Sequence, residues 1–383
     1  MTASPDDRRV ERLLVAGMVI ALLLPVITVA PNRLLSGSGI ELHALLHGER
    51  LWLLFPLLWL LIAPFLPRSW PAGAAMAAIA LGNGLLWLTG QEAALRTVGD
   101  DSLVRVSFGP GFWLLLLCLG LLLKHLASRM RARHAMGLVL LVSALSPALV
   151  MLWKGMLDPL SLMQEFFNVQ DTLLQATREH LMLVAGSAVP AICLGAGFGF
   201  VAYKRPRLQG WVLAGFNVLQ TIPSIAMFGL LIGPMAALGH WLPQSGIAGI
   251  GMAPALVALA LYSLLPMTHA TLAALNQVPA AARQAGRGLG MTPVQLLLRV
   301  ELPLALPVFI AGIRITVVQT VGLAAVAALI GAGGFGAILF QGLAASAPDQ
   351  VILGVLPIVL LTITLDSLFQ LLISTLDAHH DRT

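Results

Sequence analysis

The chain contains 383 residues, of which 58% are hydrophobic and only 10% are charged, and its formal net charge is +5. A composition this apolar excludes a water-soluble globular protein and indicates a protein that lies in a lipid bilayer. The basic residues are spread among short polar segments and form no block, so the charge does not indicate a nucleic-acid partner. Cys118 and Cys193 lie inside apolar runs, which indicates packing and not a disulfide framework.

Ten apolar runs follow one another along the chain, each close to the roughly 20 residues that a helix needs to cross a bilayer. The runs do not alternate apolar with polar residues, so we expect helices and no strands. The sequence therefore predicts an all-α integral membrane protein with about ten transmembrane helices. The predicted spans are 13–30, 51–66, 71–90, 111–127, 136–153, 181–202, 211–237, 250–275, 304–330 and 351–375.

An even number of spans places both termini on the same side of the membrane. With the termini in the cytoplasm, 16 of the 22 Lys and Arg residues lie on or near the cytoplasmic side. Cytoplasmic segments of membrane proteins carry the excess of Lys and Arg. We therefore expect a multi-pass membrane protein with both termini, and the loop at 276–303, in the cytoplasm.

The first apolar run, 13–30, allows two interpretations. It follows a charged start and ends with small residues at Thr28 and Ala30, as a cleavable signal peptide does. We favour a retained span, because removing it would upset the distribution of positive charge across the membrane.

The polar segment 154–180 divides the chain and is predicted to lie outside the membrane. Phe166 and Phe167 lie there among acidic and amide side chains, which suits either an amphipathic segment on the membrane surface or an ordinary connecting loop. Residues 1–153 form an N-terminal extension of five spans without a motif that indicates a function. Residues 181–375 hold the other five spans and every informative motif.

Within the predicted seventh span, a proline interrupts the backbone hydrogen bonding of the helix. Pro223 has no N–H and leaves a carbonyl of the preceding turn without its partner. At membrane depth such a carbonyl is tolerated only where protein or water covers it. We interpret the region as part of a translocation path, with a kinked packing helix as the alternative. The candidate path residues are Asn217, Gln220, Thr221, Pro223 and Ser224.

The loop at 276–303 contains the start and stop signals of two short helices. Pro279 suits the start of the first helix, and Gly290 lets the backbone turn out of it. Thr292 then suits an N-cap, with Pro293 at the first helical position. Small residues in the first helix would let a partner's surface approach, and its two arginines could bind acidic groups of that partner. The alternative is a solvated basic loop that merely follows the positive-inside rule.

Two charged residues lie deep inside predicted spans, far from either end. Arg314 is about 15 Å and Asp366 about 14 Å from the cytoplasmic end of its own span, at 1.5 Å per residue. A charge alone in lipid is costly, so we predict that the two side chains pair or share a water-filled cavity. We favour a structural clamp over a direct role with a transported solute.

A glycine-rich segment follows the ninth span. Gly331, Gly333 and Gly334 give the backbone unusual freedom. The segment is a candidate hinge of an external gate, or simply the place where the helix ends.

The loop resembles the cytoplasmic EAA loop of importer permeases of the ATP-binding cassette class. Residues 284–303 read Gln-Ala-Gly, three residues, Gly, nine residues and Val-Glu-Leu-Pro, which keeps the spacing of that family. The chain departs from the family at Gln284, Gly286 and Val300, where the family carries Glu, Ala and Ile. In that family the loop docks on the ATPase subunit. The coupling residues that the resemblance implies are Arg283, Gln284, Ala285, Gly286, Arg287, Gly290, Leu302 and Pro303.

Four further phrases resemble permeases for osmoprotectants such as glycine betaine and choline. They are Gln-Thr-Ile-Pro-Ser at 220–224, Leu-Tyr-Ser-Leu-Leu-Pro at 261–266, Glu-Leu-Pro-Leu-Ala-Leu-Pro at 301–307 and Ile-Gly-Ala-Gly-Gly-Phe-Gly at 330–336. The resemblance covers about residues 178–375. It implies a five-helix type I importer core of the methionine-importer kind that pairs with a second permease subunit, either a copy of this chain or a relative.

The chain has no phosphate-binding loop, since none of its lysines, Lys124, Lys154 and Lys204, follows a glycine. We therefore expect no catalytic residue, no metal and no cofactor in this chain, with ATP bound by a separate ATPase subunit pair and the solute delivered by an external binding protein. Alternatives are a permease for amino acids or methionine and, in another class, an ion-coupled secondary transporter. The resemblance also implies a place in the bacterial cytoplasmic membrane.

Overall fold

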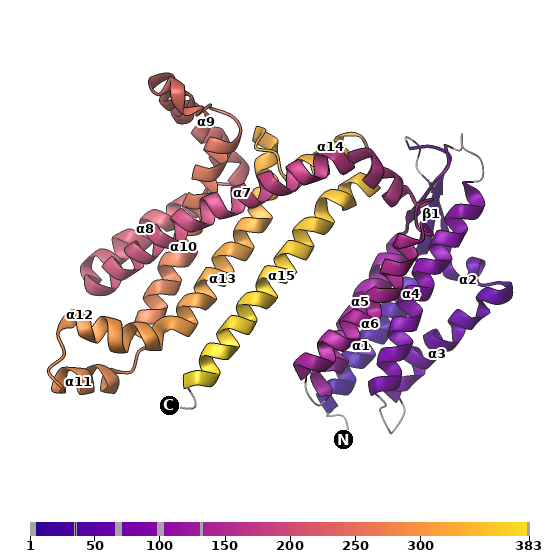
Figure 1. Ribbon diagram of the computed structural model, residues 1–383, viewed down its shortest axis with the longest axis horizontal. Helices are drawn as coiled ribbons and strands as arrows, with labels where there is room; N and C mark the ends of the chain where they lie inside the picture. The colour runs from indigo at the N-terminus through magenta and orange to yellow at the C-terminus, as the bar shows by residue number, and fades with distance from the viewer. Residues whose placement is uncertain are drawn as a thin grey trace. The chain divides into compact units, whose positions relative to one another are not determined.

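The computed structural model describes residues 5–33, 35, 37–65, 71–97, 103–130 and 133–380. The chain divides into two compact units, unit 1 (Met1–Asn168) and unit 2 (Val169–Thr383). Both are built mainly of helices (Figure 1). Within the described residues, eight helical segments are long and apolar enough to cross a membrane. The predicted all-α membrane architecture is therefore confirmed, with two corrections to its spans and a small sheet.

Unit 1 contains helices connected by short strands and 3-10 turns. Its helices are α1 (Pro5–Leu22), α2 (Leu42–Leu45), α3 (Leu54–Ile62), α4 (Pro71–Arg96), α5 (Pro110–Arg129) and α6 (Arg133–Trp153), with 3-10 helices η1 (Gly48–Leu53) and η2 (Ala63–Phe65) at the ends of α3. Its strands are β1 (Pro25–Ala30), β2 (Ser38–Glu41) and β3 (Arg105–Phe108). The core buries Met18, Leu81 and Leu115 from α1, α4 and α5.

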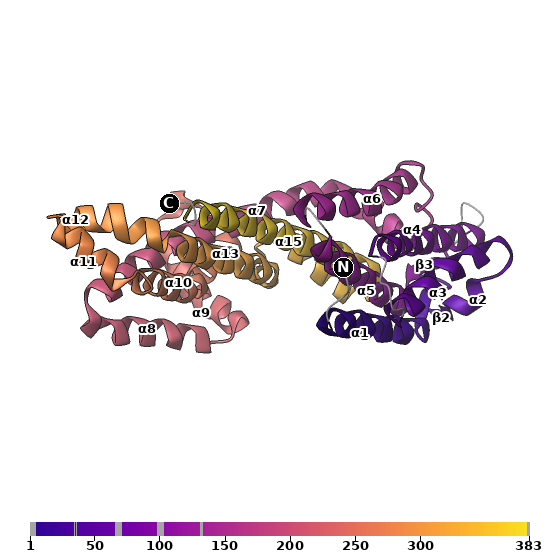
Figure 2. The ribbon, with the colours of Figure 1, turned by 90° about the horizontal axis from the view of Figure 1, so that it is seen from below.

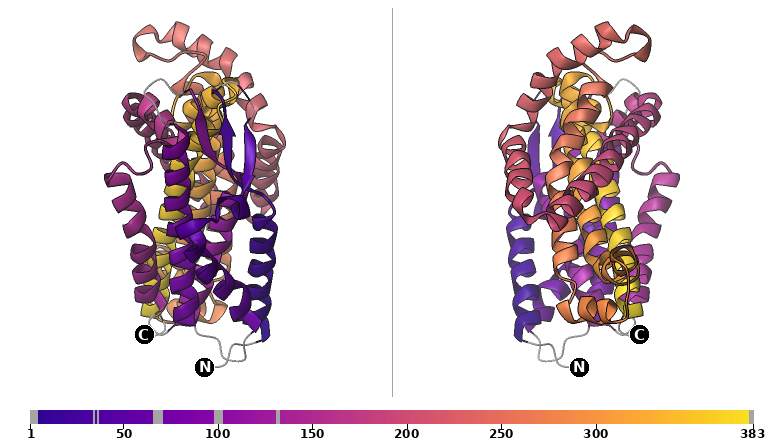
Figure 3. Two further views of the ribbon diagram at one scale, coloured as in Figure 1. Left: turned by 90° about the vertical axis from the view of Figure 1, so that its right-hand side faces the viewer. Right: turned by 90° about the vertical axis from the view of Figure 1, so that its left-hand side faces the viewer.

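The three strands form an antiparallel sheet in the order β2-β1-β3, at one end of the helices of unit 1 (Figure 3). Ile27 in β1 pairs with Ile40 in β2 and with Phe108 in β3. The expectation of no strands is wrong, and so are the bounds of the first span. The helix of that run ends at Leu22, and the β-branched residues after Pro25 form a central strand instead.

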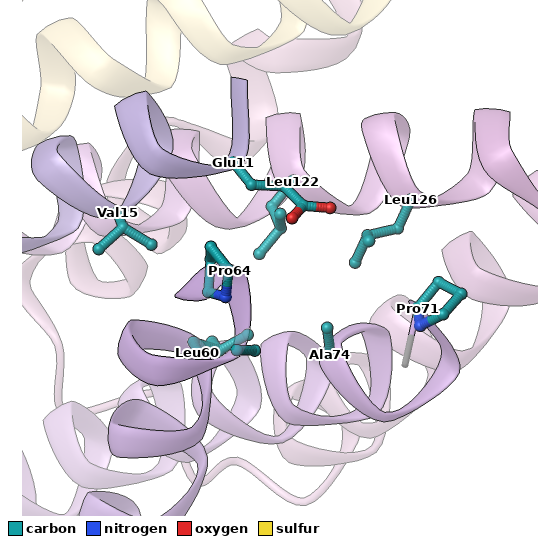
Figure 4. A pocket seen from close by; sticks show the side chains of 9 residues that line it. Glu11, Val15, Leu60, Pro64, Pro71, Ala74, Leu122 and Leu126 are labelled. Carbon is teal, nitrogen blue, oxygen red and sulfur yellow. The ribbon is translucent and has the colours of Figure 1, made fainter. Parts of the chain in front are cut away.

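The buried charges of unit 1 are paired. Glu92 in α4 accepts hydrogen bonds from Arg50 and Arg96, the latter at 2.8 Å. Glu11 in α1 pairs with Arg129 in α5 and borders a pocket of about 20 Å³, too small for more than one water molecule. Figure 4 shows its carboxylate among apolar side chains. These pairs hold the helices together, because an unpaired buried charge is costly.

Unit 2 is formed by the C-terminal part of the 44-residue helix α7 (Ser161–Lys204) and by eight further helices. These are α8 (Pro206–Thr221), α9 (Ser224–Trp241), α10 (Met252–Asn276), α11 (Ala280–Gly288), α12 (Pro293–Leu296), α13 (Leu302–Val326), α14 (Phe335–Ala344) and α15 (Pro348–His380). Helices α10, α13 and α15 run side by side (Figures 1 and 2). A hydrogen bond of 2.9 Å between the hydroxyls of Ser263 and Thr320 joins α10 to α13.

Two predicted features of this half differ from the structure. The segment 154–180 is not a separate loop, because residues 161–180 form the first turns of α7. The predicted seventh span, 211–237, is two helices, since α8 ends at Thr221 and α9 begins at Ser224. Proline disfavours the helical conformation of the residue before it, so Pro223 ends α8 instead of merely kinking it.

Candidate coupling loop and translocation path

The loop at 276–303 forms a compact elbow of two short helices. Helix α11 ends at Gly288, and Gly290 takes a φ of +77°, which turns the chain toward α12. Thr292 caps α12 in a capping box. Its hydroxyl accepts the Gln295 N–H at 3.3 Å, and the Gln295 side chain accepts the Thr292 N–H at 2.9 Å. A π-helical turn, η4 (Leu297–Glu301), leads from α12 into α13.

The elbow presents exposed small, polar and apolar side chains at its surface. Gln284, Ala285 and Arg287 on α11 are exposed, as the expected docking face requires. Gly286 is not part of that face. It is buried, and a Cβ at this position would lie 2.6 Å from the Leu296 side chain, so the missing side chain lets α11 pack on α12. The prediction that Gly286 admits a partner is therefore wrong.

Two apolar side chains of the elbow were missed in the sequence. Leu289 is 78% exposed and Val294 is 64% exposed. Large apolar side chains on a polar loop are candidates for a protein interface. A large apolar residue isolated among glycines, as Leu289 is between Gly288 and Gly290, is a signal that would have found the first of them. Leu302 and Pro303, at the start of α13, are also exposed.

Arg283 contacts acceptor groups of its own chain. Its guanidinium donates to the carbonyl oxygen of Leu275 at 2.6 Å, and its Nε lies 3.3 Å from Glu301 Oε1. It also lies over the ring of Tyr203, 5.6 Å from the centroid. Within this chain the acid that Arg283 contacts is Glu301, and a contact of Arg283 with a partner stays a prediction.

The candidate path residues lie at the junction between α8 and α9. The side chain of Gln220 donates to the carbonyl oxygen of Tyr262 in α10 at 3.0 Å, and the Tyr262 hydroxyl donates to the carbonyl oxygen of Ile222. Tyr262, only 7% exposed, thereby supplies a partner for backbone at the helix break. The sequence predicted a backbone group without its partner at Pro223, but it did not indicate that Tyr262 binds the neighbouring Ile222 carbonyl.

The other path candidates differ in exposure. Asn217, Thr221 and Pro223 are exposed and Ser224 is half-buried. The Thr221 hydroxyl donates to the carbonyl oxygen of Val218 within its own helix at 2.7 Å. The polar surface of this junction is therefore offered mainly by Asn217 and the backbone around Pro223.

Replacing Tyr262 with phenylalanine is expected to destabilise the helix junction. The change leaves the Ile222 carbonyl without this donor, which costs about 1–3 kcal/mol when the group stays buried. The measurement is the midpoint of thermal unfolding of the purified chain in detergent. Thr221→Val, which removes a hydroxyl bound within its own helix, is the control and should shift the midpoint less. Equal midpoints for Tyr262→Phe and the native chain would contradict the assigned hydrogen bond.

The glycine segment after α13 is fixed by a carboxylate. Gly331, Gly333 and Gly334 have φ values of +79°, +77° and +76°, a region that residues with a Cβ rarely adopt. The Gly334 N–H donates to Glu179 Oε2 in α7 at 2.8 Å, and the Gln175 side chain donates to the other carboxylate oxygen at 2.8 Å. The candidate hinge is therefore held to α7 in this conformation.

Arg314 in α13 and Asp366 in α15 form the predicted ion pair. The Arg314 Nε lies 2.5 Å from Asp366 Oδ1, and the Gln370 side chain donates to Asp366 Oδ2 at 2.9 Å. Each charged side chain is 31% exposed in the isolated chain. The pair joins two helices that each have the length and apolarity of a membrane span.

A bundle of membrane-length helices with a capped elbow before the start of α13 is the arrangement expected of a transport permease, and comparison with known proteins identifies this class. Residues 191–379 match the family described as the binding-protein-dependent transport system inner membrane component. Residues 7–163 match the family described as the N-terminal domain of ABC transporter permease YehY.

Individual relatives agree with the match to the transport-system family. The chain is 45% identical over 194 residues to the osmoprotectant import permease protein OsmW of Salmonella typhimurium, covering 51% of this chain and 86% of the relative. It is 34% identical over 194 residues to the choline transport system permease protein OpuBB of Bacillus subtilis, covering 51% of this chain and 83% of the relative. The chain therefore belongs to the family of inner membrane components of binding-protein-dependent transport systems and is a multi-pass permease subunit of an ABC transporter.

A solved structure of the methionine ABC transporter MetNI, in an inward-facing conformation, has a similar fold. The TM-score is 0.50 at 24% identity, and the match covers 55% of this chain and 98% of that chain. At this identity the likeness shows the fold alone, which is the predicted type I importer core.

Proposed function

We propose that this chain is the permease subunit of an ATP-driven importer of osmoprotectants such as glycine betaine and choline. The observation that carries the proposal is the 45% identity to an osmoprotectant import permease over half of the chain. A carnitine transport permease of Listeria monocytogenes, 32% identical over 194 residues, supports the same class of solute. Methionine or another amino acid is the second candidate, since the fold is shared with a methionine transporter.

The elbow is proposed to bind one of two cytoplasmic ATPase subunits. Arg287 and Arg299 on or beside it, with Arg205 and Arg207 after α7, favour the cytoplasmic side for this end of unit 2. Both termini are proposed to lie in the cytoplasm as well, from the distribution of Lys and Arg over the whole sequence. ATP binds to the partner subunits, and the chain contributes the docking surface formed by Gln284, Ala285, Arg287, Leu289 and Val294.

Transport is proposed to proceed by alternating access. Closure of the ATPases moves α11 and α12, and this movement shifts α8, α9, α10 and α13 so that the path opens outward. The exposed polar junction around Asn217 and Pro223 would then face a second permease subunit, either a copy of this chain or a relative, across the path. The segment with Gly331, Gly333 and Gly334 would act as a gate on the outer side, where a solute-binding protein delivers its cargo.

The proposal is tested by uptake of radiolabelled glycine betaine into vesicles that contain this chain, its ATPase and its binding protein. We expect uptake to require ATP, and unlabelled choline or carnitine to compete while methionine does not. Vesicles without the ATPase are the control. Competition by methionine alone would show that the solute is an amino acid and not an osmoprotectant. Accumulation driven by an ion gradient without the ATPase would show that the chain is an ion-coupled secondary transporter.

A further inference from the structure

One buried carboxylate joins three parts of unit 2 near the elbow. Glu301 is 2% exposed and lies at the end of η4, where α13 begins. The Tyr203 hydroxyl donates to its Oε1 at 3.0 Å, Arg283 Nε lies 3.3 Å from the same oxygen, and Lys204 Nζ lies 3.6 Å from Oε2. Two of these three side chains are the last residues of α7, and the third belongs to α11. We call this group the Glu301 cluster.

The cluster ties the elbow to α7 by interactions that are costly to break. Removing one partner of a buried ion pair leaves an uncompensated charge, so the members are expected to move together. Cation–π contacts with one ring reinforce the connection. Lys204 Nζ lies 5.0 Å and Arg283 Cζ lies 5.6 Å from the centroid of the Tyr203 ring. A displacement of α11 is therefore passed to the C-terminal end of α7 as well as to α13.

The same helix holds the glycine segment at the opposite end of unit 2. Glu179 precedes Lys204 by 25 residues of continuous helix, which is about 37 Å at 1.5 Å per residue. It accepts the Gly334 N–H, and His180 beside it is fully buried with its ring 4.9 Å from that of Phe335 at the start of α14. One helix thus contacts the elbow through its C-terminal end and the gate segment through Glu179 and His180, near its middle.

Between these two contacts, α7 packs closely on α10. A Cβ at Gly199 would lie 2.6 Å from the Thr271 side chain and 2.7 Å from the Thr268 carbonyl oxygen, so the two backbones approach closely. Helices in direct contact at small residues move as packed bodies, because a well-packed interface does not deform continuously.

We propose that the part of α7 from Glu179 to Lys204 is the mechanical link between the ATPase-docking elbow and the outer gate. Glu301 is the positioning residue that contacts its C-terminal end, and Glu179 is the residue that holds the glycine segment. The inference rests on the proposed function of the elbow and extends it. When the ATPases move the elbow, the Glu301 cluster carries α7 along, and Glu179 releases the backbone of the glycine segment so that the gate opens.

The test uses the complete transporter in vesicles with Glu301→Gln, which removes the charge but keeps the size of the side chain. We expect the ATPase to remain bound and to hydrolyse ATP, while solute transported per ATP falls by about 5- to 150-fold, the range of typical coupling energies. Glu301→Asp, which keeps the charge, should restore part of the amount of solute transported per ATP. Glu165→Gln, at another 2% exposed and ion-paired glutamate but in unit 1, is the matched control and should leave the ratio unchanged.

A labelling measurement reports the gate without depending on the solute. Cys118 and Cys193 are replaced by alanine, Leu329→Cys places a thiol at a 48% exposed position before the glycine segment, and an impermeant maleimide is added with and without ATP and vanadate. We expect ATP to change the labelling rate in the native background, Glu301→Gln to abolish the change, and Glu179→Gln to give the ATP-bound rate without ATP.

The outcomes separate the link from the proposed function. If native vesicles label differently with ATP but take up no betaine, the solute assignment fails and the link can still be judged. An ATP-dependent labelling change that survives in Glu301→Gln, with a native transport ratio, overturns the link. If the Glu301→Gln transporter does not assemble, the double variant Tyr203→Phe with Lys204→Met replaces it. This variant keeps the carboxylate paired with Arg283, and the solute transported per ATP and the ATP-dependent labelling change then test the link.

Discussion

Ala285→Asp is expected to abolish both binding of the ATPase and solute uptake. Ala285 is an exposed small residue in the middle of α11, beside Gln284 and one turn before Leu289. A new carboxylate buried at a subunit interface without a partner costs about 3–5 kcal/mol, by analogy with a broken buried pair. Since every 1.4 kcal/mol is tenfold in affinity, the complex should weaken by roughly two to three and a half orders of magnitude.

The measurement is the amount of ATPase that co-purifies with the chain, with uptake followed in parallel. Ala345→Asp is the matched control, because Ala345 is also exposed and follows a short helix, but lies beyond the opposite end of α13 from the elbow. The control should retain the ATPase. Undiminished co-purification with Ala285→Asp would show that the docking surface lies elsewhere on the chain.

The elbow was largely predictable from sequence because its signals are local. Pro279, Gly290, Thr292 and Pro293 each impose a backbone conformation or cap within a few residues, and the structure has the two helices in that order. The direction of individual side chains was not predictable. Whether Gly286 faces a partner or α12 depends on how two helices pack, and spacing along one helix does not contain that information.

The first span and the seventh span show two different limits. Val26, Ile27 and Val29 continue an apolar run without a break, so their period does not distinguish a helix from a buried strand. Their partners lie in 38–41 and 105–108, and such pairing is not visible locally. In the seventh span the signal was present, since Pro223 restricts the residue before it, and the sequence interpretation gave more weight to the length of the apolar run.

The Glu301 cluster and the Arg314–Asp366 pair differ in the same way. The pairing of Arg314 with Asp366 was predictable because both charges are isolated in apolar spans at equal depth. Few other groups there could offset the cost of burying either charge. Glu301 lies in a loop with several charged residues nearby, so the sequence offered many possible partners and no criterion for choosing among them. Only the fold brings Tyr203, about 100 residues earlier, into contact with it.

Breaking the pair between α13 and α15 is expected to reduce the amount of folded transporter in the membrane. Asp366→Asn leaves the charge of Arg314 without its ion-pair partner, and Arg314→Leu leaves that of Asp366. A charged residue at the centre of a membrane helix costs about 2.5–3.5 kcal/mol on the insertion scale. The measurement is the yield of monodisperse protein and its midpoint of thermal unfolding. Thr362→Val, one turn before Asp366, is the control, because its hydroxyl binds only Ile358 in the same helix.

The double variant Arg314→Leu with Asp366→Leu separates a structural clamp from a role in transport. Replacing a buried ion pair by apolar residues of similar volume is often neutral or stabilising, so the midpoint of unfolding should return toward the native value. If the pair only clamps α13 to α15, uptake returns with stability, and the coupling energy in the double-mutant cycle is about 0.5–3 kcal/mol. Restored stability without uptake would instead assign the pair to the path of the solute. Simple addition of the two single effects would contradict the pairing, since independent residues do not compensate for one another.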